Sequence, residues 1–298
     1  MENEMTDINL DGFGNVLPPK NDKIALIDAD TLVYTACLKA EQEIILNPKE
    51  TYTDEEWSEI MNNPTYDEGG NSIWESNLDD IIKFATEKLN KILDLTGCQK
   101  YELHFSYGKE NFRYKLYPEY KLNRKYIRRP CLLNEAKDFF VKNGGHKHTF
   151  IEADDAVVWL KRNYPEKYIL CCVDKDVYNA VSGQHFNYYE SGLFDKDMHW
   201  VSTTEKEAEM WPYKQAIIGD KSDNIIGLKG VGPAKVKNYI KEDGDYRQQL
   251  IDAYESFGRT EQEALLNLAL VTCGDNKIMK DYFKENIIYM NRDMPYVY

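Results

Sequence analysis

Short apolar segments of four to six residues, separated by longer segments with helical spacing, limit this chain to an α/β fold. The apolar segments are residues 24–27, 101–106, 148–151 and 168–173. Apolar residues recur at helical spacing in 31–45, 73–95 and 153–162. Because strands that alternate with helices form parallel sheets, we expect a mostly parallel central sheet with helices on both faces.

The order of these segments divides the chain into three regions. We expect a flexible tail at 1–22, an α/β core at 23–204 with an acidic insertion at 46–72 and a basic segment at 108–130, and a helical part at 205–298. Glycines and prolines interrupt regular structure in the tail and in the insertion.

The distribution of charge excludes a general nucleic-acid binder but allows a local one. The net charge is −14, and residues 41–68 hold nine acids and one lysine. Residues 109–129 hold eight Lys or Arg and two Glu. An acidic protein with one basic strip can still bind a phosphate backbone through that strip.

The same composition indicates a cytoplasmic protein. No run of about 18 apolar residues is present, so we expect no membrane span. Met1–Leu17 is too acidic for a signal peptide. The six cysteines form no Cys-x-x-Cys pair, which favours reduced thiols over disulfides or a zinc site. We expect a monomer in the cytoplasm of a bacterium or of a phage-infected host.

Carboxylates follow three of the predicted strands, and another pair lies in the helical part. Because ligands bind at the carboxyl ends of the strands in open α/β sheets, we expect these acids to converge. Their spacings of two in extended chain and three in helices allow them to act together. The predicted metal ligands are Asp28, Asp30, Glu152, Asp154, Asp155, Asp174, Asp176, Asp220 and Asp223.

Nine carboxylates in one crevice would repel one another unless protons or cations neutralise them. Oxygen ligands suit Mg²⁺ or Mn²⁺ better than zinc. Two such ions about 4 Å apart would activate a water and stabilise the leaving oxygen of a phosphodiester. The alternative is that each acid is a helix cap or a solvated turn residue.

The basic strip interleaves Lys and Arg with tyrosines, a pattern that suits single-stranded nucleic acid. Lys121 and Arg124 are three apart, so on a helix they would face the same way. A solvated charged helix is the alternative. The predicted nucleic-acid contacts in the strip are Arg113, Lys115, Tyr120, Lys125, Arg128 and Arg129.

A Gly-rich turn offers a second contact with a phosphate backbone. Gly227, Gly230 and Gly232 free the chain to adopt positive φ and expose backbone N–H groups. We expect a helix to begin near Pro233, with Lys235 in its first turn, and to bind phosphate without reading sequence. An ordinary helix–helix turn is the alternative. The five histidines show no metal-ligand spacing and are expected to be structural.

Together these segments resemble the flap endonuclease and 5′→3′ exonuclease superfamily, which includes the 5′-nuclease domain of bacterial DNA polymerase I. The acidic motifs at 27–30, 151–155, 173–176 and 219–225 resemble its metal-binding motifs. Segments 111–113 and 117–124 resemble the opening of its helical arch, and 227–235 resembles its helix-hairpin-helix-type motif. The likeness is strongest to phage replication exonucleases and covers residues 23–275.

The resemblance implies roles for the matching positions. Asp28, Glu152, Asp154 and Asp155 would hold the ion that activates water, and Asp174, Asp176, Asp220 and Asp223 the second ion. Lys121 and Arg124 would contact the scissile phosphate, and K⁺ would bind at the Gly227–Gly232 turn. The implied substrate is DNA with a 5′ end, a flap or a single-strand junction, or an RNA–DNA hybrid, in phage replication or recombination.

One position departs from the family pattern. Many members carry an Asp just after the second strand, where this chain has Ser106. Our hypothesis is that Asp30 compensates or that water fills the gap.

Two other functions are compatible with parts of the sequence. Residues 28–31 and 219–223 resemble motifs of haloacid-dehalogenase-like phosphatases, which have no use for the acids at 152–155. A catalytically silent DNA-structure binder would use the basic strip and the turn alone. It would not need nine acids gathered in one crevice.

Overall fold

The central sheet of the computed structural model positions the ends of five parallel strands along one edge. The structure describes residues 18–190 and 198–280, and within them the sheet has six strands in the order β5-β4-β1-β6-β7-β8. All neighbours run parallel except β7 and β8. The strands are β1 (Asn21–Asp28), β4 (Cys98–Ser106), β5 (His146–His148), β6 (Tyr168–Cys172), β7 (Gly183–Asn187) and β8 (His199–Thr203).

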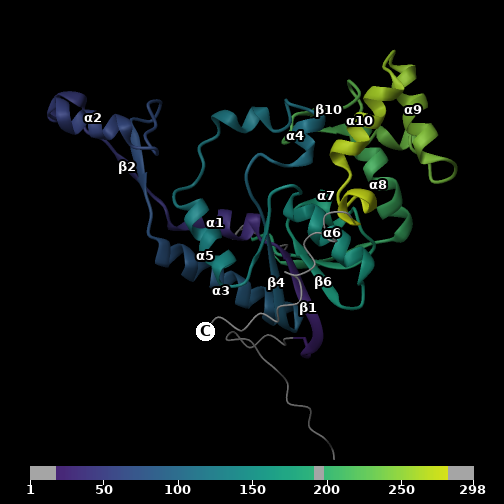
Figure 1. Cartoon of the computed structure of the whole chain (residues 1–298), viewed down its shortest axis with the longest axis horizontal. Helices are drawn as coiled ribbons and strands as arrows, with labels where there is room; N and C mark the ends of the chain where they lie inside the picture. Colours follow the sequence, from purple (N-terminus) through teal and green to yellow (C-terminus); the bar gives the residue numbers. More distant parts are fainter. Residues whose placement is uncertain (1–17, 191–197, 281–298) are drawn as a thin grey trace, which may run out of the picture.

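Helices cover both faces of this sheet, as the sequence predicts (Figure 1). One face carries α1 (Asp30–Ala40), α3 (Leu78–Thr96) and α5 (Leu133–Lys142), which pack on Ala25 and Ile27. The other carries α6 (Ala153–Asn163), which packs on Leu26 and Leu170, and the short α7 (Lys175–Tyr178). Alternate residues of β1 thus face opposite cores, as strand geometry requires.

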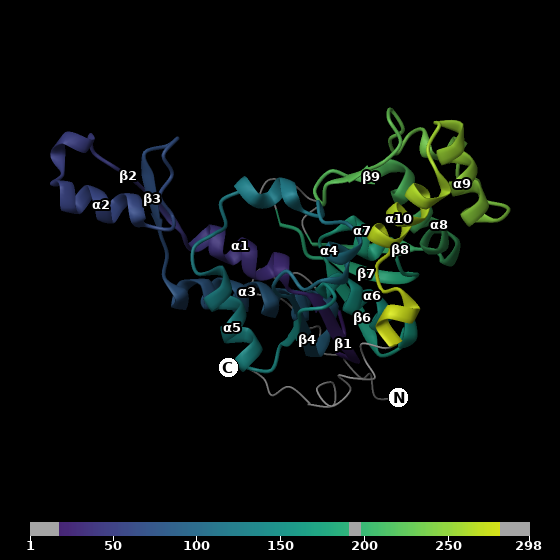
Figure 2. The ribbon, with the colours of Figure 1, turned by 45° about the horizontal axis from the view of Figure 1, so that its top comes forward.

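An arm projects from the sheet beyond α1 (Figures 1 and 2). It is an antiparallel pair, β2 (Gln42–Ile45) and β3 (Ser72–Glu75), that encloses the 3₁₀-helix η1 (Lys49–Thr51) and α2 (Asp54–Asn62). The expected helix at 31–45 is wrong beyond Ala40, because the following residues pair with β3. Residues 72–75 are likewise strand, so the expected helix at 73–95 begins only at Leu78.

The C-terminal part has its own core beside the sheet, around Ile217, Leu250 and Tyr254. Its elements are α8 (Glu205–Ile218), β9 (Gly219–Asp220), β10 (Ile225–Ile226), η3 (Val236–Asn238), α9 (Tyr246–Ser256) and α10 (Glu261–Val271). Between core and helices lie α4 (Phe112–Leu116) and η2 (Leu122–Tyr126), so the basic segment is two short helical turns joined by loop. Figures 1 and 2 show α4 beside α10 of the C-terminal part.

Three further observations concern expectations from the sequence. The third predicted strand, at 148–151, lies instead at His146–His148, and Glu152 is the N-cap of α6. In the part of the chain that is described, no helix has the length and apolarity to cross a membrane. The expected tail at 1–22 falls mostly outside the described residues, although β1 already begins at Asn21.

Candidate active site

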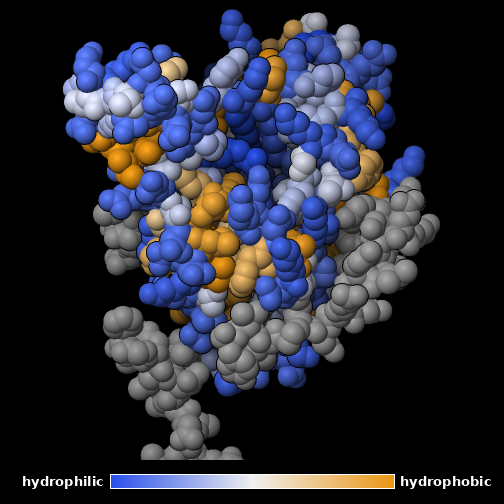
Figure 3. All heavy atoms as spheres, turned by 60° about the vertical axis from the view of Figure 1, so that its left-hand side comes forward, coloured by the Kyte–Doolittle hydropathy of each residue, from blue (hydrophilic) through white to orange (hydrophobic). Residues whose placement is uncertain are grey.

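Acids from four separate segments of the chain line one cavity at the carboxyl ends of the central strands. Figure 3 shows a hydrophilic hollow on this face of the molecule. Of the nine predicted metal ligands, all but Asp155 line the cavity: Asp28, Asp30, Glu152, Asp154, Asp174, Asp176, Asp220 and Asp223.

The fold explains this convergence. Strands β1 and β6 are parallel neighbours, so Asp28 at the end of one lies near Asp174, which follows the other and caps α7. Helix α6 starts at the same edge and contributes Glu152 and Asp154. The β9–β10 hairpin brings Asp220 and Asp223 from the C-terminal part. The crevice rule for parallel sheets therefore holds here.

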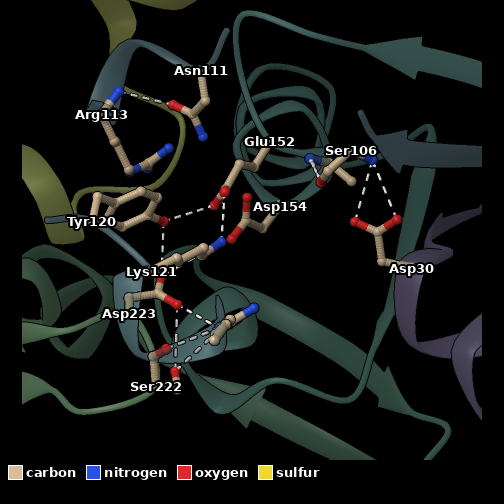
Figure 4. Close-up of polar contacts among 12 residues, drawn as sticks. Asp30, Ser106, Asn111, Arg113, Tyr120, Lys121, Glu152, Asp154, Ser222 and Asp223 are labelled. Atoms are coloured by element: carbon tan, nitrogen blue, oxygen red, sulfur yellow. Dashed lines mark hydrogen bonds and ion pairs between the residues drawn. The ribbon is translucent and has the colours of Figure 1, made fainter. Parts of the chain in front are cut away.

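Asp30 lies at the edge of this cavity and is held by two partners (Figure 4). Its carboxylate accepts from the backbone N–H of Ser106 at 3.2 Å and pairs with Lys137 Nζ at 2.5 Å. Asp30 thus occupies the neighbourhood of the position where the family pattern has another Asp. Lys137 balances its charge, and the idea that Asp30 compensates at Ser106 remains a prediction.

Asp155, one of the predicted metal ligands, does not line the cavity. Its carboxylate is paired with Arg113 through two bonds of 2.6 and 2.8 Å, and it also accepts from the N–H groups of Glu152 and Gly274. The side chains of both Arg113 and Asp155 are only 2% exposed. Asp155 faces away from the cavity because it caps α6 and anchors Arg113, so the alternative of a helix cap is the right one for this residue.

Arg113 and Tyr120 are corrections to the predicted nucleic-acid contacts. Arg113 also donates to the backbone oxygens of Leu270 and Thr272, which ties α4 to the end of α10. Tyr120 is 2% exposed, and its hydroxyl lies 2.7 Å from Asp223 Oδ2 and 3.0 Å from Glu152 Oε2. Both side chains are buried in the wall of the cavity, where protein partners take up their polar atoms.

Two cations of the basic segment reach into the acids (Figure 4). Lys121 Nζ lies 2.5 Å from Glu152 and 3.6 Å from Asp223. Arg124 Nη2 lies 2.5 Å from Asp223. They face the same way as predicted, but from a 3₁₀ turn that follows the left-handed conformation of Lys121, φ 56°, rather than from an α-helix.

Burial and mutual repulsion perturb the pKa values of the acids. Burial, followed by the charge of Asp30, raises the pKa of Asp28 to about 8. Burial and Asp174 raise the pKa of Asp176 to about 7, and the pKa of Asp154 is raised by burial and by Glu152. Burial alone would raise the pKa of Glu152, but Lys121 and Arg113 together lower it to about 2.

The donor set fits divalent cations. Every acid in the cavity offers hard oxygen ligands, as Mg²⁺ and Mn²⁺ require. Asp176 Oδ1 is buried with no hydrogen-bond partner among the described residues. A buried carboxylate oxygen without a partner is costly, and a cation in the cavity would remove that cost.

The raised pKa values predict how the metal-free protein responds to pH. A carboxyl with a raised folded pKa contributes stability below its unfolded value of 3.8, and this is lost as pH rises through about 7 for Asp176 and about 8 for Asp28. In EDTA, we expect the melting temperature to fall by roughly 5 °C or more between about pH 5 and about pH 8.5. Differential scanning fluorimetry measures the change.

Mg²⁺ should largely remove this fall, because it neutralises the same carboxylates. A variant with Asp28→Asn and Asp176→Asn is the matched control and should show a flatter pH profile in EDTA. A melting temperature that stays level or rises over this range in the wild type would contradict the repulsion in the cavity.

The other predicted contacts of the basic segment differ in exposure. Lys115, Lys125 and Arg129 are exposed. Arg128 is occupied, since it pairs with Glu41 and lies over the Trp74 ring at 4.0 Å. It joins the segment to the base of the β2–β3 arm.

Of the three glycines expected at positive φ in the Gly-rich turn, only Gly230 adopts it, and the predicted helix does not begin at Pro233. Gly230 has φ +77°, and a side chain at Gly230 or Gly232 would meet nothing within 4 Å. Gly227 instead packs on the end of α8, where an added Cβ would lie 2.3 Å from the Ile217 oxygen. Pro233 begins turns and the three-residue η3, so no regular helix starts there, and the exposed Lys235 donates to the Gly230 oxygen.

Some residues that line the cavity or contact its acids were not predicted from the sequence. Gln215 of α8 donates to Asp176, and Lys137 of α5 pairs with Asp30. Both lie in ordinary helical sequence. Ser222 donates to Asp220 and lies inside the acidic motif at 219–225.

Comparison with known proteins finds partial sequence similarity to a 5′-3′ exonuclease and to DNA polymerase I. No family model matches the chain. It is 29% identical over 113 residues to a 5′-3′ exonuclease of Aquifex aeolicus, 36% of this chain and 38% of that protein. It is 28% identical over 178 residues to the thermostable DNA polymerase I of Thermus caldophilus, 55% of this chain and 20% of that protein. The chain therefore spans well under half the length of either relative.

The fold is that of the T5 5′-exonuclease. A structure of that exonuclease with divalent zinc ions bound superposes with a TM-score of 0.57, covering 90% of this chain and 99% of that one at 16% identity. The mostly parallel sheet with helices on both faces, predicted from the sequence, is confirmed by this likeness.

Proposed function

We propose that this chain is a metal-dependent 5′→3′ nuclease that hydrolyses phosphodiester bonds near a 5′ end. The observation that carries the proposal is the gathering of eight carboxylates, from four segments, in one cavity that also holds Lys121 and Arg124. The sequence similarity to a 5′-3′ exonuclease and the T5 5′-exonuclease fold support it.

Two Mg²⁺ or Mn²⁺ ions fit this cavity. Asp28, Glu152 and Asp154 would hold one, and Asp174, Asp176, Asp220 and Asp223 the other, with Asp30 near the first. Such ions supply an activated water and balance the charge of the leaving oxygen.

The chain's own residues provide binding and orientation. Lys121 and Arg124 now neutralise Glu152 and Asp223, and a bound phosphate would compete for the same two cations. Tyr120 fixes the spacing of Glu152 and Asp223 through its hydroxyl. Lys121 thus stands between the acids and the position of a scissile phosphate.

No side chain of the cavity is set up as a nucleophile. Burial raises the pKa of Cys273, which keeps its thiol protonated. Ser106 accepts from the Ala153 N–H, and Ser222 donates to Asp220. Water therefore attacks phosphorus, the bond to the 3′ oxygen breaks, and the products carry a 5′-phosphate and a 3′-hydroxyl.

The exposed residues around the cavity supply a path for the substrate. Lys115, Lys125 and Arg129 would follow phosphates, and Tyr126, 87% exposed, offers a ring for base stacking. The turn at 230–235 would contact duplex backbone through its N–H groups, with K⁺ as a candidate ion there. We further propose a monomer that acts in the cytoplasm in replication or recombination, on DNA ends or flaps or on RNA–DNA hybrids.

A gel assay with 5′-labelled duplex, 5′-flap and RNA–DNA hybrid substrates tests the function. We expect cleavage near the 5′ end in Mg²⁺, no cleavage in EDTA, and recovery when Mg²⁺ is restored. Hydrolysis of nitrophenyl phosphate without cleavage of any nucleic acid would favour a phosphatase instead. Binding that persists in EDTA, with no cleavage in either Mg²⁺ or Mn²⁺, would favour a silent DNA-binding protein.

A further inference from the structure

A second group of metal-ligand side chains lies on the sheet outside the acid cavity. Glu102, His104 and His146 each offer one ligand atom, and these atoms all lie within 4.8 Å of one another. None of the three lines the acid cavity. The histidines were expected to be structural, because their spacing along the sequence shows no metal motif.

Strand pairing brings the three together. Glu102 and His104 are two apart on β4, so their side chains point to the same face of the sheet. His146 of the edge strand β5 is the direct parallel partner of His104. The two imidazole rings stack with their centroids 4.6 Å apart. The group therefore forms only when β5 pairs with β4 in this register.

One nitrogen of the His104 imidazole lies in the middle of the group without a hydrogen-bond partner among the described residues. The residue is 0% exposed, and its Nε2 has no hydrogen-bond partner within the described part of the chain. Glu102 Oε2 lies 3.8 Å from this nitrogen, which is too far for a hydrogen bond. A buried polar atom in this state costs free energy.

Neither tautomer of His104 gives its Nε2 a hydrogen-bond partner within the described residues. Its Nδ1 lies 2.9 Å from His148 Nε2, so one proton is shared there. If His104 donates that proton, its Nε2 carries a lone pair that faces a carboxylate. If His104 accepts it, the proton on Nε2 points at an acceptor out of reach. A cation between Nε2 and Glu102 satisfies the first arrangement completely.

The surroundings resemble the outer shell of a metal site. His148 fixes the orientation of the His104 ring through Nδ1. The Tyr168 hydroxyl lies 3.1 Å from both Glu102 oxygens, which orients the carboxylate. Such outer partners are what hold ligating His and Glu side chains in place. Lys167 Nζ, 3.6 Å from Glu102, is 48% exposed and can move away when another cation binds.

We propose that Glu102, His104 and His146 bind a transition-metal ion of the zinc class at a site separate from the acid cavity. Two imidazole nitrogens and one carboxylate oxygen suit Zn²⁺, whereas Mg²⁺ prefers oxygen alone. Burial lowers the pKa of both His104 and His146, which keeps the rings in the neutral form that binds metal. Glu102 and His146 are partly exposed, which leaves a route for the ion.

The bound ion would join the three-residue edge strand β5 to β4. That strand leads within four residues to Glu152, the N-cap of α6 in the acid cavity. We therefore expect zinc at this site to raise the melting temperature, because it binds only the folded arrangement.

The test uses full-length protein freed of metal and then titrated with Zn²⁺ alone in excess Mg²⁺, with calorimetry and bound-metal analysis as readouts. Zinc that binds in the acid cavity would add to the total in this experiment. The variants are therefore compared with the wild type, in which the acid cavity is the same. We expect His146→Asn to bind one zinc fewer than wild type. His199→Asn, an exposed histidine of β8, is the matched control and should bind the same number as wild type.

Co²⁺ gives an independent readout of the ligands. Nitrogen ligands in a four-coordinate site produce strong visible absorption, which oxygen sites in six-coordinate geometry lack. We expect this absorption in wild type and in His199→Asn, and its loss in His146→Asn. If His146→Asn does not fold, judged by its melting curve in EDTA, Glu102→Gln replaces it with the same expectations.

Equal zinc binding and equal Co²⁺ spectra in wild type and in a folded cluster variant would overturn the proposal. A zinc-induced rise in melting temperature that is equal in wild type and in His146→Asn would also overturn it. So would a wild type whose melting temperature does not rise with zinc. Nuclease activity enters neither readout, so the outcome is independent of the proposed function.

Discussion

Asp154→Asn is expected to reduce turnover by roughly 10³-fold while leaving nucleic-acid binding intact. Asp154 lines the cavity, and burial, followed by the charge of Glu152, raises its pKa. The amide keeps the shape of the side chain but removes a negative oxygen ligand. Single-turnover cleavage in Mg²⁺ measures the loss, and binding of labelled flap DNA in Ca²⁺ measures affinity.

The stability of this variant separates a catalytic effect from unfolding. Because Asp154→Asn removes one charge from a crowded cluster, its melting temperature in EDTA should equal or exceed that of wild type. Asp252→Asn, on the exposed side of α9, is a matched control that should retain full turnover. Turnover above about a tenth of wild type in Asp154→Asn would show that the cavity is not the catalytic centre.

Arg113→Met is expected to destabilise the protein by about 3–5 kcal/mol, a fall of roughly 10 °C in melting temperature. The substitution leaves the Asp155 carboxylate buried without its cation, with only the N–H groups of Glu152 and Gly274 as partners. It also removes two bonds to the backbone at Leu270 and Thr272. Chemical denaturation gives the free energy of unfolding.

Two further variants show whether the ion pair is the cause. Arg247→Met removes the partner of Glu261 in a pair whose side chains are both more than half exposed, and should cost at most about 1 kcal/mol. Arg113→Met combined with Asp155→Leu should recover part of the loss, because no unpaired charge remains. If Arg113→Met were as mild as Arg247→Met, the pair would not be what holds α4 to the end of α10.

The ion pair between Arg113 and Asp155 changes the effect that we expect from substitutions at Asp155. From the sequence alone, Asp155 ranks with Asp154 as a metal ligand. In the structure it anchors Arg113, so Asp155→Asn should lower stability in the way Arg113→Met does. Both residues stand in the first turn of α6, and the difference between them is which side of the helix each occupies.

The sequence by itself determined the mostly parallel class of the sheet, three of its strands and most of the cavity, whereas β5 was displaced and β7 and β8 were not predicted. Apolar runs such as 168–173 read as buried strands, and a parallel sheet brings their carboxyl ends to one edge. Asp28 and Asp174 could therefore be placed together although 146 residues separate them in number. These inferences are possible because the pattern of a buried strand is contained in a few consecutive residues.

Only the tertiary structure decided which side chains pair with one another. Arg113 with Asp155, Lys137 with Asp30, and His104 with His146 pair residues whose separations along the chain carry no periodic signal. The same holds for the β2–β3 arm, where pairing between strands overrode the helical spacing of residues 41–45. Side-chain direction and strand register arise from the packing of distant segments, which no local pattern encodes.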